Sequence, residues 1–349
     1  MNTQVSNTIK ICRLLCIFFM TYVHVNPGPD SWGSEAPQHL QWIGLIMSDV
    51  LGRASVPALS LIGGFLAVSA IRKRPHWLTY TKERFLTLIV PAVSWNIIIL
   101  VVSLGILFTT QSETAVIREF RSVESYSPWF ILDKLTGYNY GSITMAFNFL
   151  RDIFVCSLIL PVLIPLIKRT GIITLIIIWV AGITIGFSPF IFRPHILMFF
   201  SFGIFLYIQF EESATIKNIL LKSLSAIAIS LIVTYIISLF WPRNIELHST
   251  VLRIIVVISI ISFCYLIKKT KLSKMIISIE PISFLLFLSH QTVMLVLWGA
   301  WQVFFGKEIT DSYTFFYMLS PIFTVTIVLF LYKITQHTPK QLNIAIKGK

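Results

Sequence analysis

The chain has 349 residues, of which 56% are hydrophobic and only 12% are charged, and its mean hydropathy is +0.81. Soluble domains carry about 25% charged residues, so this composition excludes an ordinary soluble protein and indicates an integral membrane protein. The formal net charge of +13 could suggest a nucleic-acid partner, but the basic residues lie in short segments between apolar runs and form no single patch. We therefore expect the lipid bilayer, and no nucleic acid, as a partner.

Ten apolar runs are long enough to span, or nearly span, a bilayer. They predict an all-α fold, a polytopic bundle of about ten transmembrane helices that forms one domain over residues 1–349. No internal repeat and no pair of interrupted helices is visible, which counts against a secondary transporter. The expected spans are 9–25, 43–71, 83–108, 147–167, 171–189, 194–210, 218–240, 251–267, 281–300 and 314–333.

Positive charge predicts the orientation of these spans. One set of alternate connecting segments contains most of the 28 lysines and arginines, and the other set contains most of the acidic residues. Because lysine and arginine are enriched in cytoplasmic loops, we expect both termini to be cytoplasmic. The segment 109–146 would then lie outside, and its aromatic, turn-rich composition indicates a lid or binding loop.

The first span carries Arg13 near one end and His24 near the other, eleven positions apart. Eleven positions are about three helical turns, so both side chains project from one face and lie about 16 Å apart along the axis. Taken alone, Arg13 could extend to the cytoplasmic surface and His24 could sit among the outer headgroups. A charge and an imidazole on one face of a membrane helix instead favour a functional site.

The second span contains Asp49 and Arg53, which are four residues apart and therefore neighbours on one helix face. A structural ion pair and direct contact with a ligand are both open for them. The turn that follows is strongly basic and could bind anionic lipid or a phosphorylated cytosolic ligand. Its cations are Arg72, Lys73, Arg74, Lys82 and Arg84.

Further polar groups occur in later spans. Arg151 and Asp152 are adjacent, so we expect them to point to different sides of their helix and to need separate partners. Arg193 and His195 open the sixth span on the outer side. His290 lies near mid-membrane in the ninth span, where a lone buried histidine is more often a packing residue than a catalyst.

The cysteines and acidic residues indicate neither a disulfide nor a metal centre. Cys12, Cys16, Cys156 and Cys264 all lie inside apolar runs without redox or metal-ligand spacing. No cluster of histidine, aspartate and glutamate has ligand spacing either, so we expect no metal.

Five short motifs follow one another along the chain. They are the Arg13–His24 pair with ten residues between, Arg53-Ala-Ser-Val-Pro57 followed by Ile62-Gly-Gly-Phe-Leu66, Phe149-Leu-Arg-Asp152, Ser201-Phe-Gly203, and the stretch from Phe284 to His290. In this order they resemble the acyltransferase 3 superfamily of multipass membrane O-acyltransferases, and most closely its branch that modifies bacterial surface polysaccharides. The likeness extends from about residue 9 to about residue 300.

The resemblance implies transfer of an acyl group, most often acetyl, from cytosolic acyl-CoA to a sugar hydroxyl of a polysaccharide or a lipid-linked precursor. It also implies a multi-pass protein of the bacterial cytoplasmic (inner) membrane. The family often has two arginines three residues apart at the start of the third helix, where this chain has Arg84 and Thr87. Either neighbouring Lys82 and the Arg72–Arg74 cluster supply the missing cation, or the donor is held differently.

Roles follow from this resemblance together with acid–base chemistry. A sugar hydroxyl is a poor nucleophile at neutral pH, so we expect His24 to act as the general base. Arg53 or Arg151 would stabilise negative charge on the thioester carbonyl, and Asp152 would orient a histidine or the acceptor. The expected donor-binding residues are Arg13, Arg72, Lys73, Arg74, Lys82 and Arg84, and the expected acceptor-binding residues are Arg193, His195 and His290.

Two other classes of function stay open. A flippase or exporter for an anionic glycolipid would also place basic groups at both membrane faces, and Arg13 and His24 would then line a path without doing chemistry. The second alternative is a non-catalytic scaffold in a polysaccharide assembly complex. It would not explain why Arg13 and His24 share one helix face.

Overall fold

The computed structural model describes residues 3–32, 36–74, 76–110, 114, 116–117, 128–137, 141–212 and 246–348, with the side chains of 109–110, 210–212 and 246–249 left out. Among these residues every regular element is a helix, and one isolated bridge joins Phe187 to Ile191. The all-helical fold predicted from the apolar runs is therefore confirmed for the described part of the chain. The expected span 218–240 lies outside the described residues.

The first half of the chain forms long helices with local irregularities. Residues 38–71 form one rod in which a π-helical segment separates two α-helices, and residues 77–110 form a second rod of the same kind. The elements are α1 (Thr3–Val23), η1 (Pro29–Ser31), α2 (Gln38–Gly44), η2 (Leu45–Gly52), α3 (Arg53–Ile71), α4 (Trp77–Arg84), η3 (Phe85–Ile89), α5 (Val90–Thr110), α7 (Pro128–Thr136) and α8 (Met145–Leu158).

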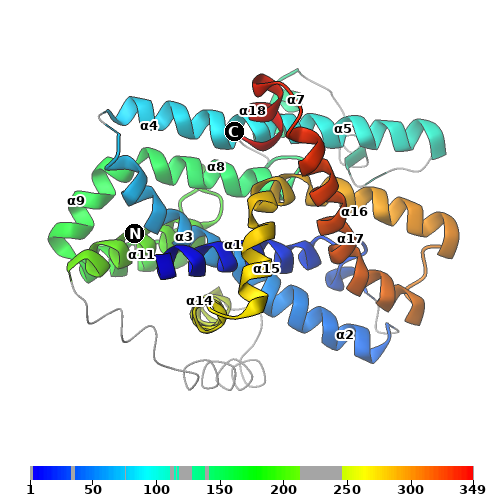
Figure 1. Ribbon diagram of the computed structural model, residues 1–349, viewed down its shortest axis with the longest axis horizontal. Coiled ribbons are helices and arrows are strands. Elements are labelled where there is room, and N and C mark those ends of the chain that lie inside the picture. The colour runs from blue at the N-terminus through cyan, green and yellow to red at the C-terminus, as the bar shows by residue number, and fades with distance from the viewer. Residues whose placement is uncertain are drawn as a thin grey trace.

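The second half continues with shorter helices and ends in two long ones. These elements are α9 (Leu160–Thr170), α10 (Ile172–Thr184), α11 (Pro194–Glu212), α14 (Glu246–Ile267), α15 (Lys271–Ile279), η4 (Glu280–Ile282), α16 (Ser283–Phe305), α17 (Asp311–Thr335) and α18 (Lys340–Lys347). Figure 1 shows α4 and α5 along one edge of the bundle, with α18 against α5, where the Trp95 indole donates to the Ile346 carbonyl at 3.0 Å.

Six of the described helices are long and apolar enough to cross a membrane. A seventh span results if α8 and α9, which meet at a bend of 65°, are counted as one broken crossing. The expected spans 171–189 and 194–210 correspond to α10 (Ile172–Thr184) and to the apolar part of α11, Pro194–Gln209, which are shorter than the six. The chain is therefore a multi-pass membrane protein, and a count of ten remains a prediction.

Helix α1 lies in the interior of the bundle, where it contacts α3, α14, α16 and α17 (Figure 1). Small residues bring α3 against α11: a Cβ atom at Gly64 would overlap the Phe200 carbonyl, and one at Gly203 would overlap the Leu61 carbonyl. Gly64 thus permits a close approach of the two helix backbones, as small residues do in membrane helices. An aromatic cluster that includes Tyr22, Tyr313 and Tyr317 packs around the C-terminal end of α1.

The predicted orientation can be tested with reporters at the two ends of α17. Glu308 and Gln336 are both exposed, and Lys and Arg asymmetry predicts the first outside and the second in the cytoplasm. We expect Glu308→Cys, but not Gln336→Cys, to react with an impermeant maleimide in intact cells. The four native cysteines are free and buried, so the wild-type protein is the unlabelled control. Labelling of Gln336→Cys from outside would reverse the topology.

Candidate functional site

The side chains of Arg13 and His24 both face the segment formed by η4 and α16. Arg13 forms an ion pair with the buried carboxylate of Glu280, the first residue of η4. His24, the first residue after α1, contacts two consecutive residues of α16, His290 and Gln291. The shared face predicted from helical periodicity therefore exists, and the structure adds the second helix that it faces.

A pair of imidazoles lies at the end of α1. The ring centroids of His24 and His290 are 5.0 Å apart with their planes inclined by 53°. His290 is fully buried, and its Nδ1 lies 2.7 Å from the Phe287 carbonyl, so Nδ1 carries the hydrogen. Among the described residues its Nε2 has no hydrogen-bond partner. His290 is thus part of a histidine pair rather than the lone packing residue that sequence reasoning favoured.

Gln291 is the second residue of α16 that contacts His24. Its amide nitrogen lies 3.1 Å from His24 Nδ1, while its amide oxygen is buried and finds no partner in the described part of the chain. Buried polar atoms without partners are rare in folded proteins and call for an explanation. Two of them, in Gln291 and His290, lie beside the residue predicted to be the base.

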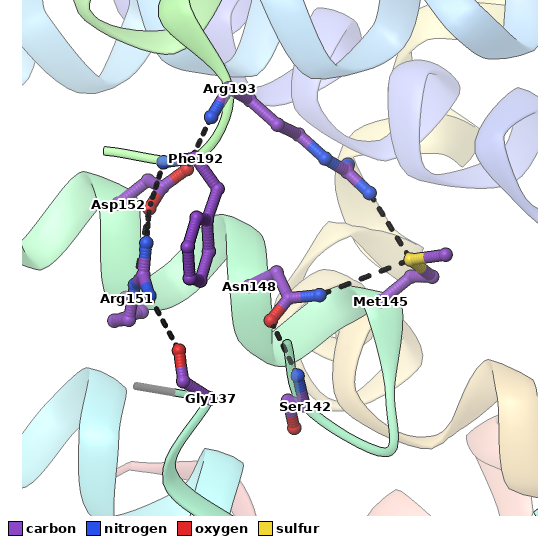
Figure 2. A network of polar contacts seen from close by, with 8 residues as sticks. All are labelled: Gly137, Ser142, Met145, Asn148, Arg151, Asp152, Phe192 and Arg193. Carbon is purple, nitrogen blue, oxygen red and sulfur yellow. Dashed lines mark hydrogen bonds and ion pairs between the residues drawn. The ribbon is translucent and has the colours of Figure 1, made fainter. Parts of the chain in front are cut away.

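Arg193 is a further cation to consider at this site. It precedes α11, and its charge acts electrostatically on His24. Its guanidinium donates to the Met145 thioether sulfur at 3.2 Å, and no carboxylate of the described residues lies at ion-pair distance from it (Figure 2). A thioether is a weak acceptor, so most of the hydrogen-bonding capacity of this cation remains for a ligand.

Arg151 and Asp152 form an ion pair with each other, and the expectation that they need separate partners was wrong. Arg151 Nη2 donates to Asp152 Oδ1 at 2.7 Å, and its Nε reaches the same oxygen at 3.2 Å. The error came from Cβ directions alone, because the long arginine side chain folds back across its neighbour. Its guanidinium also lies 3.6 Å from the centroid of the Phe192 ring and donates to the Gly137 carbonyl (Figure 2).

Asp152 fixes the chain just before α11. Fully buried, it accepts the backbone N–H groups of Arg193 at 3.1 Å and of Phe192 at 3.4 Å in addition to the arginine (Figure 2). A carboxylate that accepts several hydrogen bonds fixes the segment that donates them relative to its own helix. Asp152 therefore fixes the backbone of Phe192 and Arg193 just before α11.

Arg53 is engaged by two carboxylates. Of the two interpretations left open for Asp49 and Arg53, the structure shows the ion pair, with 3.0 Å between Arg53 Nε and Asp49 Oδ1. Asp30 of the adjoining loop accepts from Nη2 at 3.0 and 3.2 Å. Arg53 is thus a structural link between the start of α3 and η1, and less available than Arg193 to a ligand.

His195 also has a charged partner, which sequence reasoning missed. Arg253 of α14 places Nη1 3.1 Å from His195 Nδ1. Arg253 occupies the third position of the apolar run 251–267, and that isolated charge was the one signal that could have marked it. The residues Glu280 and Gln291 carried no such signal, because a sequence does not indicate which distant helix faces α1.

The basic turn between α3 and α4 divides into paired and exposed cations. Arg74 donates to Glu83 with 2.6 Å between Nε and Oε2, and Arg72 and Arg84 lie over the rings of Tyr207 and Tyr80. Lys73 and Lys82 are exposed. Thr87, at the position where a second arginine was expected, has its carbonyl against Gly348 at the end of α18. The C-terminal helix therefore covers the backbone next to Thr87.

Two of the four buried cysteines are neighbours on α1. Cys12 and Cys16 on α1 have sulfur atoms 3.8 Å apart. All four cysteines are free thiols. No group of three or more histidine, cysteine, aspartate or glutamate side chains with metal-binding geometry occurs in the described ranges.

Comparisons with known proteins give a consistent result. Residues 7–333 match the family described as an acyltransferase domain. The succinoglycan biosynthesis protein ExoH of Rhizobium meliloti (strain 1021) is 22% identical over 364 residues, which cover 100% of this chain and 93% of that protein. No solved structure matches the chain.

Proposed function

This chain belongs to the acyltransferase family, and from that membership we propose that it moves an acyl group from cytosolic acyl-CoA to a sugar hydroxyl of a surface polysaccharide or its lipid-linked precursor. An acetyl group is the first candidate. The name of the ExoH relative, a succinoglycan biosynthesis protein, supports a polysaccharide acceptor. The apolar helices support a place in the bacterial cytoplasmic membrane, where cytosolic acyl-CoA and a growing glycan both have access.

One observation carries the proposal: along a single helix contact, α1 against η4 and α16, a histidine pair lies at one end and an arginine–glutamate pair at the other. Arg13 and His24 are about 16 Å apart along α1. A donor whose phosphates bind near Arg13 can extend an acyl group toward His24 through the interior. This separation suits a reaction whose two substrates approach from opposite faces.

The chemistry assigned to His24 is general base catalysis. The acceptor hydroxyl oxygen attacks the thioester carbonyl carbon while its proton passes to the imidazole. The new C–O bond forms a tetrahedral oxyanion, whose collapse breaks the C–S bond. The proton then passes from the imidazolium to the leaving thiolate of CoA, which restores His24 and yields an ester and free CoA.

The oxyanion requires a cation or donor whose hydrogen bonds are not already used. Arg53 and Arg151 were expected in this role, but both are paired with carboxylates. Arg193 is the better candidate, because its guanidinium meets only a thioether among the hydrogen-bond acceptors of the described residues and its charge influences His24. We assign Arg193 to the oxyanion and Asp152 to the backbone that positions it.

Donor phosphates are assigned to Arg13 and to the exposed lysines of the basic turn. Arg13 keeps one unused donor, its buried Nε, which has no acceptor in the described part of the chain, and its side chain is 40% exposed. Lys73 and Lys82 are exposed and available to phosphate oxygens. His195 and His290 remain assigned to the acceptor side, with His290 next to the base.

Removing the two exposed lysines should weaken donor binding without affecting folding. We expect Lys73→Gln combined with Lys82→Gln to bind acetyl-CoA about tenfold more weakly, since loss of charge-assisted contacts worth about 1.4 kcal/mol gives that factor. Exposed charges contribute little to stability, so thermal unfolding should be unchanged. Calorimetry measures the affinity.

The matched control removes two exposed cations elsewhere, Lys168 and Arg169 at the end of α9. Lys168→Gln with Arg169→Gln should bind acetyl-CoA like the wild type. Equal affinities for both double variants and the wild type would assign the basic turn to lipid headgroups instead.

Release of CoA distinguishes the enzyme from an exporter. Purified protein incubated with acetyl-CoA should slowly release free CoA, because water can replace the sugar hydroxyl as nucleophile. The His24→Ala variant should not. Acetyl-CoA that stays intact in the presence of folded wild-type protein would favour an exporter or flippase for an anionic glycolipid.

A further inference from the structure

The amide of Gln291 is the hydrogen-bonding group that meets His24 Nδ1, at 3.1 Å. With the amide nitrogen in this position, only Nδ1 can accept, so the proton of the neutral ring lies on Nε2. In that tautomer the one lone pair of the ring is already used by Gln291. His24 cannot then take a proton from an acceptor hydroxyl at Nε2.

The unpartnered amide oxygen of Gln291 points to a second arrangement. Rotation of the amide by about 180° exchanges Oε1 and Nε2, which occupy nearly the same space. Oε1 would then accept a hydrogen bond from Nδ1–H, and the lone pair of Nε2 would become free. The rotation also gives a partner to an oxygen that has none among the described residues.

Accordingly we propose that Gln291 is the positioning residue of His24: its amide oxygen, turned toward Nδ1–H, selects the tautomer whose Nε2 accepts the proton of the acceptor hydroxyl. The inference rests on the proposed role of His24 as a base. Gln291 thus performs for His24 what a carboxylate performs in many histidine-containing sites, but without a negative charge. A neutral partner avoids burying an additional carboxylate between membrane helices.

Other groups around His24 do not fill this role. His290 presents its ring to His24, and its Nδ1 is committed to the Phe287 carbonyl. Arg193 is a cation and offers no acceptor. On α17 the hydroxyl of Tyr317 lies 3.4 Å from the carbonyl of Tyr22, two residues before His24. On the neighbouring π-helical segment, Asp49 forms an ion pair with Arg53.

Two substitutions at Gln291 test the proposal through kinetics of acetyl-CoA turnover. Gln291→Met keeps the size of the side chain but removes the acceptor, so kcat should fall about 10- to 100-fold while KM for acetyl-CoA stays the same. Gln291→Glu keeps an acceptor and adds a charge that stabilises the imidazolium. The acidic limb of its kcat/KM profile should therefore move to higher pH, by about one unit.

The control is Gln302→Met, eleven positions further along α16 and without an assigned role, which should match the wild type in kcat and pH profile. Size-exclusion chromatography verifies that each variant is folded, and the uncharged Gln291→Met variant still tests the role of Gln291 if the charged variant does not fold. Wild-type kcat in folded Gln291→Met, or an unmoved acidic limb in folded Gln291→Glu, would overturn the role of Gln291. Failure of the wild type itself to release CoA would instead refute the proposed function.

Discussion

Replacing His24 with alanine should lower acyl transfer by about 10²- to 10⁴-fold, the contribution typical of a general base. Donor affinity should survive, because the phosphates would bind about 16 Å away at the Arg13 end of α1. His24 follows the end of α1 and is only partly buried, so its loss should change the stability little. Transfer is measured as acylated glycan by mass spectrometry, and affinity for acetyl-CoA by calorimetry.

Two further histidine variants serve as comparisons for His24→Ala. His337→Ala, at an exposed position after α17, should behave like the wild type in both measurements. His290→Ala removes a fully buried ring and should reduce stability as well as transfer. Robust transfer by folded His24→Ala would remove the histidine from the mechanism and favour the exporter.

The ion pair between Arg13 and Glu280 gives the second large effect. Arg13→Ala should lose donor affinity, but it also leaves the buried carboxylate of Glu280 without its cation. Removing one partner of a buried pair costs about 3–5 kcal/mol of unfolding free energy, and the 40% exposure of the Arg13 side chain reduces our expectation to about 1–3 kcal/mol. The single variant therefore mixes two effects.

A double variant separates them. Arg13→Met with Glu280→Gln removes both charges, so we expect it to recover most of the stability but not the affinity for acetyl-CoA. Thermal unfolding in detergent and calorimetry provide the two readings. Donor affinity that returns to the wild-type value in the double variant would show that Arg13 serves only to neutralise Glu280.

Local periodicity predicted much of this site. The eleven-residue spacing of Arg13 and His24 correctly indicated a shared face, and the four-residue spacing of Asp49 and Arg53 correctly indicated neighbours on one face. Of the two open interpretations of Asp49 and Arg53, the structure shows the ion pair. Both inferences concern one helix, whose geometry is fixed by its backbone. The matched family covers the region from which the motifs were read.

Tertiary partners could not be predicted in the same way. Glu280 and Gln291 lie more than 260 residues from Arg13 and His24, the residues that they contact, and no local pattern marks them. The Arg151–Asp152 pair was misjudged because a flexible side chain can reach a partner that backbone direction places elsewhere. Span counting failed to anticipate the bend between α8 and α9, because hydropathy does not report a change of helix direction.

The central claim is that this protein adds an acyl group to a surface glycan, and mass spectrometry of that glycan tests it most directly. Glycans would be compared from cells with the wild-type protein, without it, and with the His24→Ala variant. We expect an acyl increment, acetyl or a longer group, that is present only with the wild-type protein. Identical glycan masses in all three, with the glycan still present at the surface, would contradict the assignment as an acyltransferase acting on it.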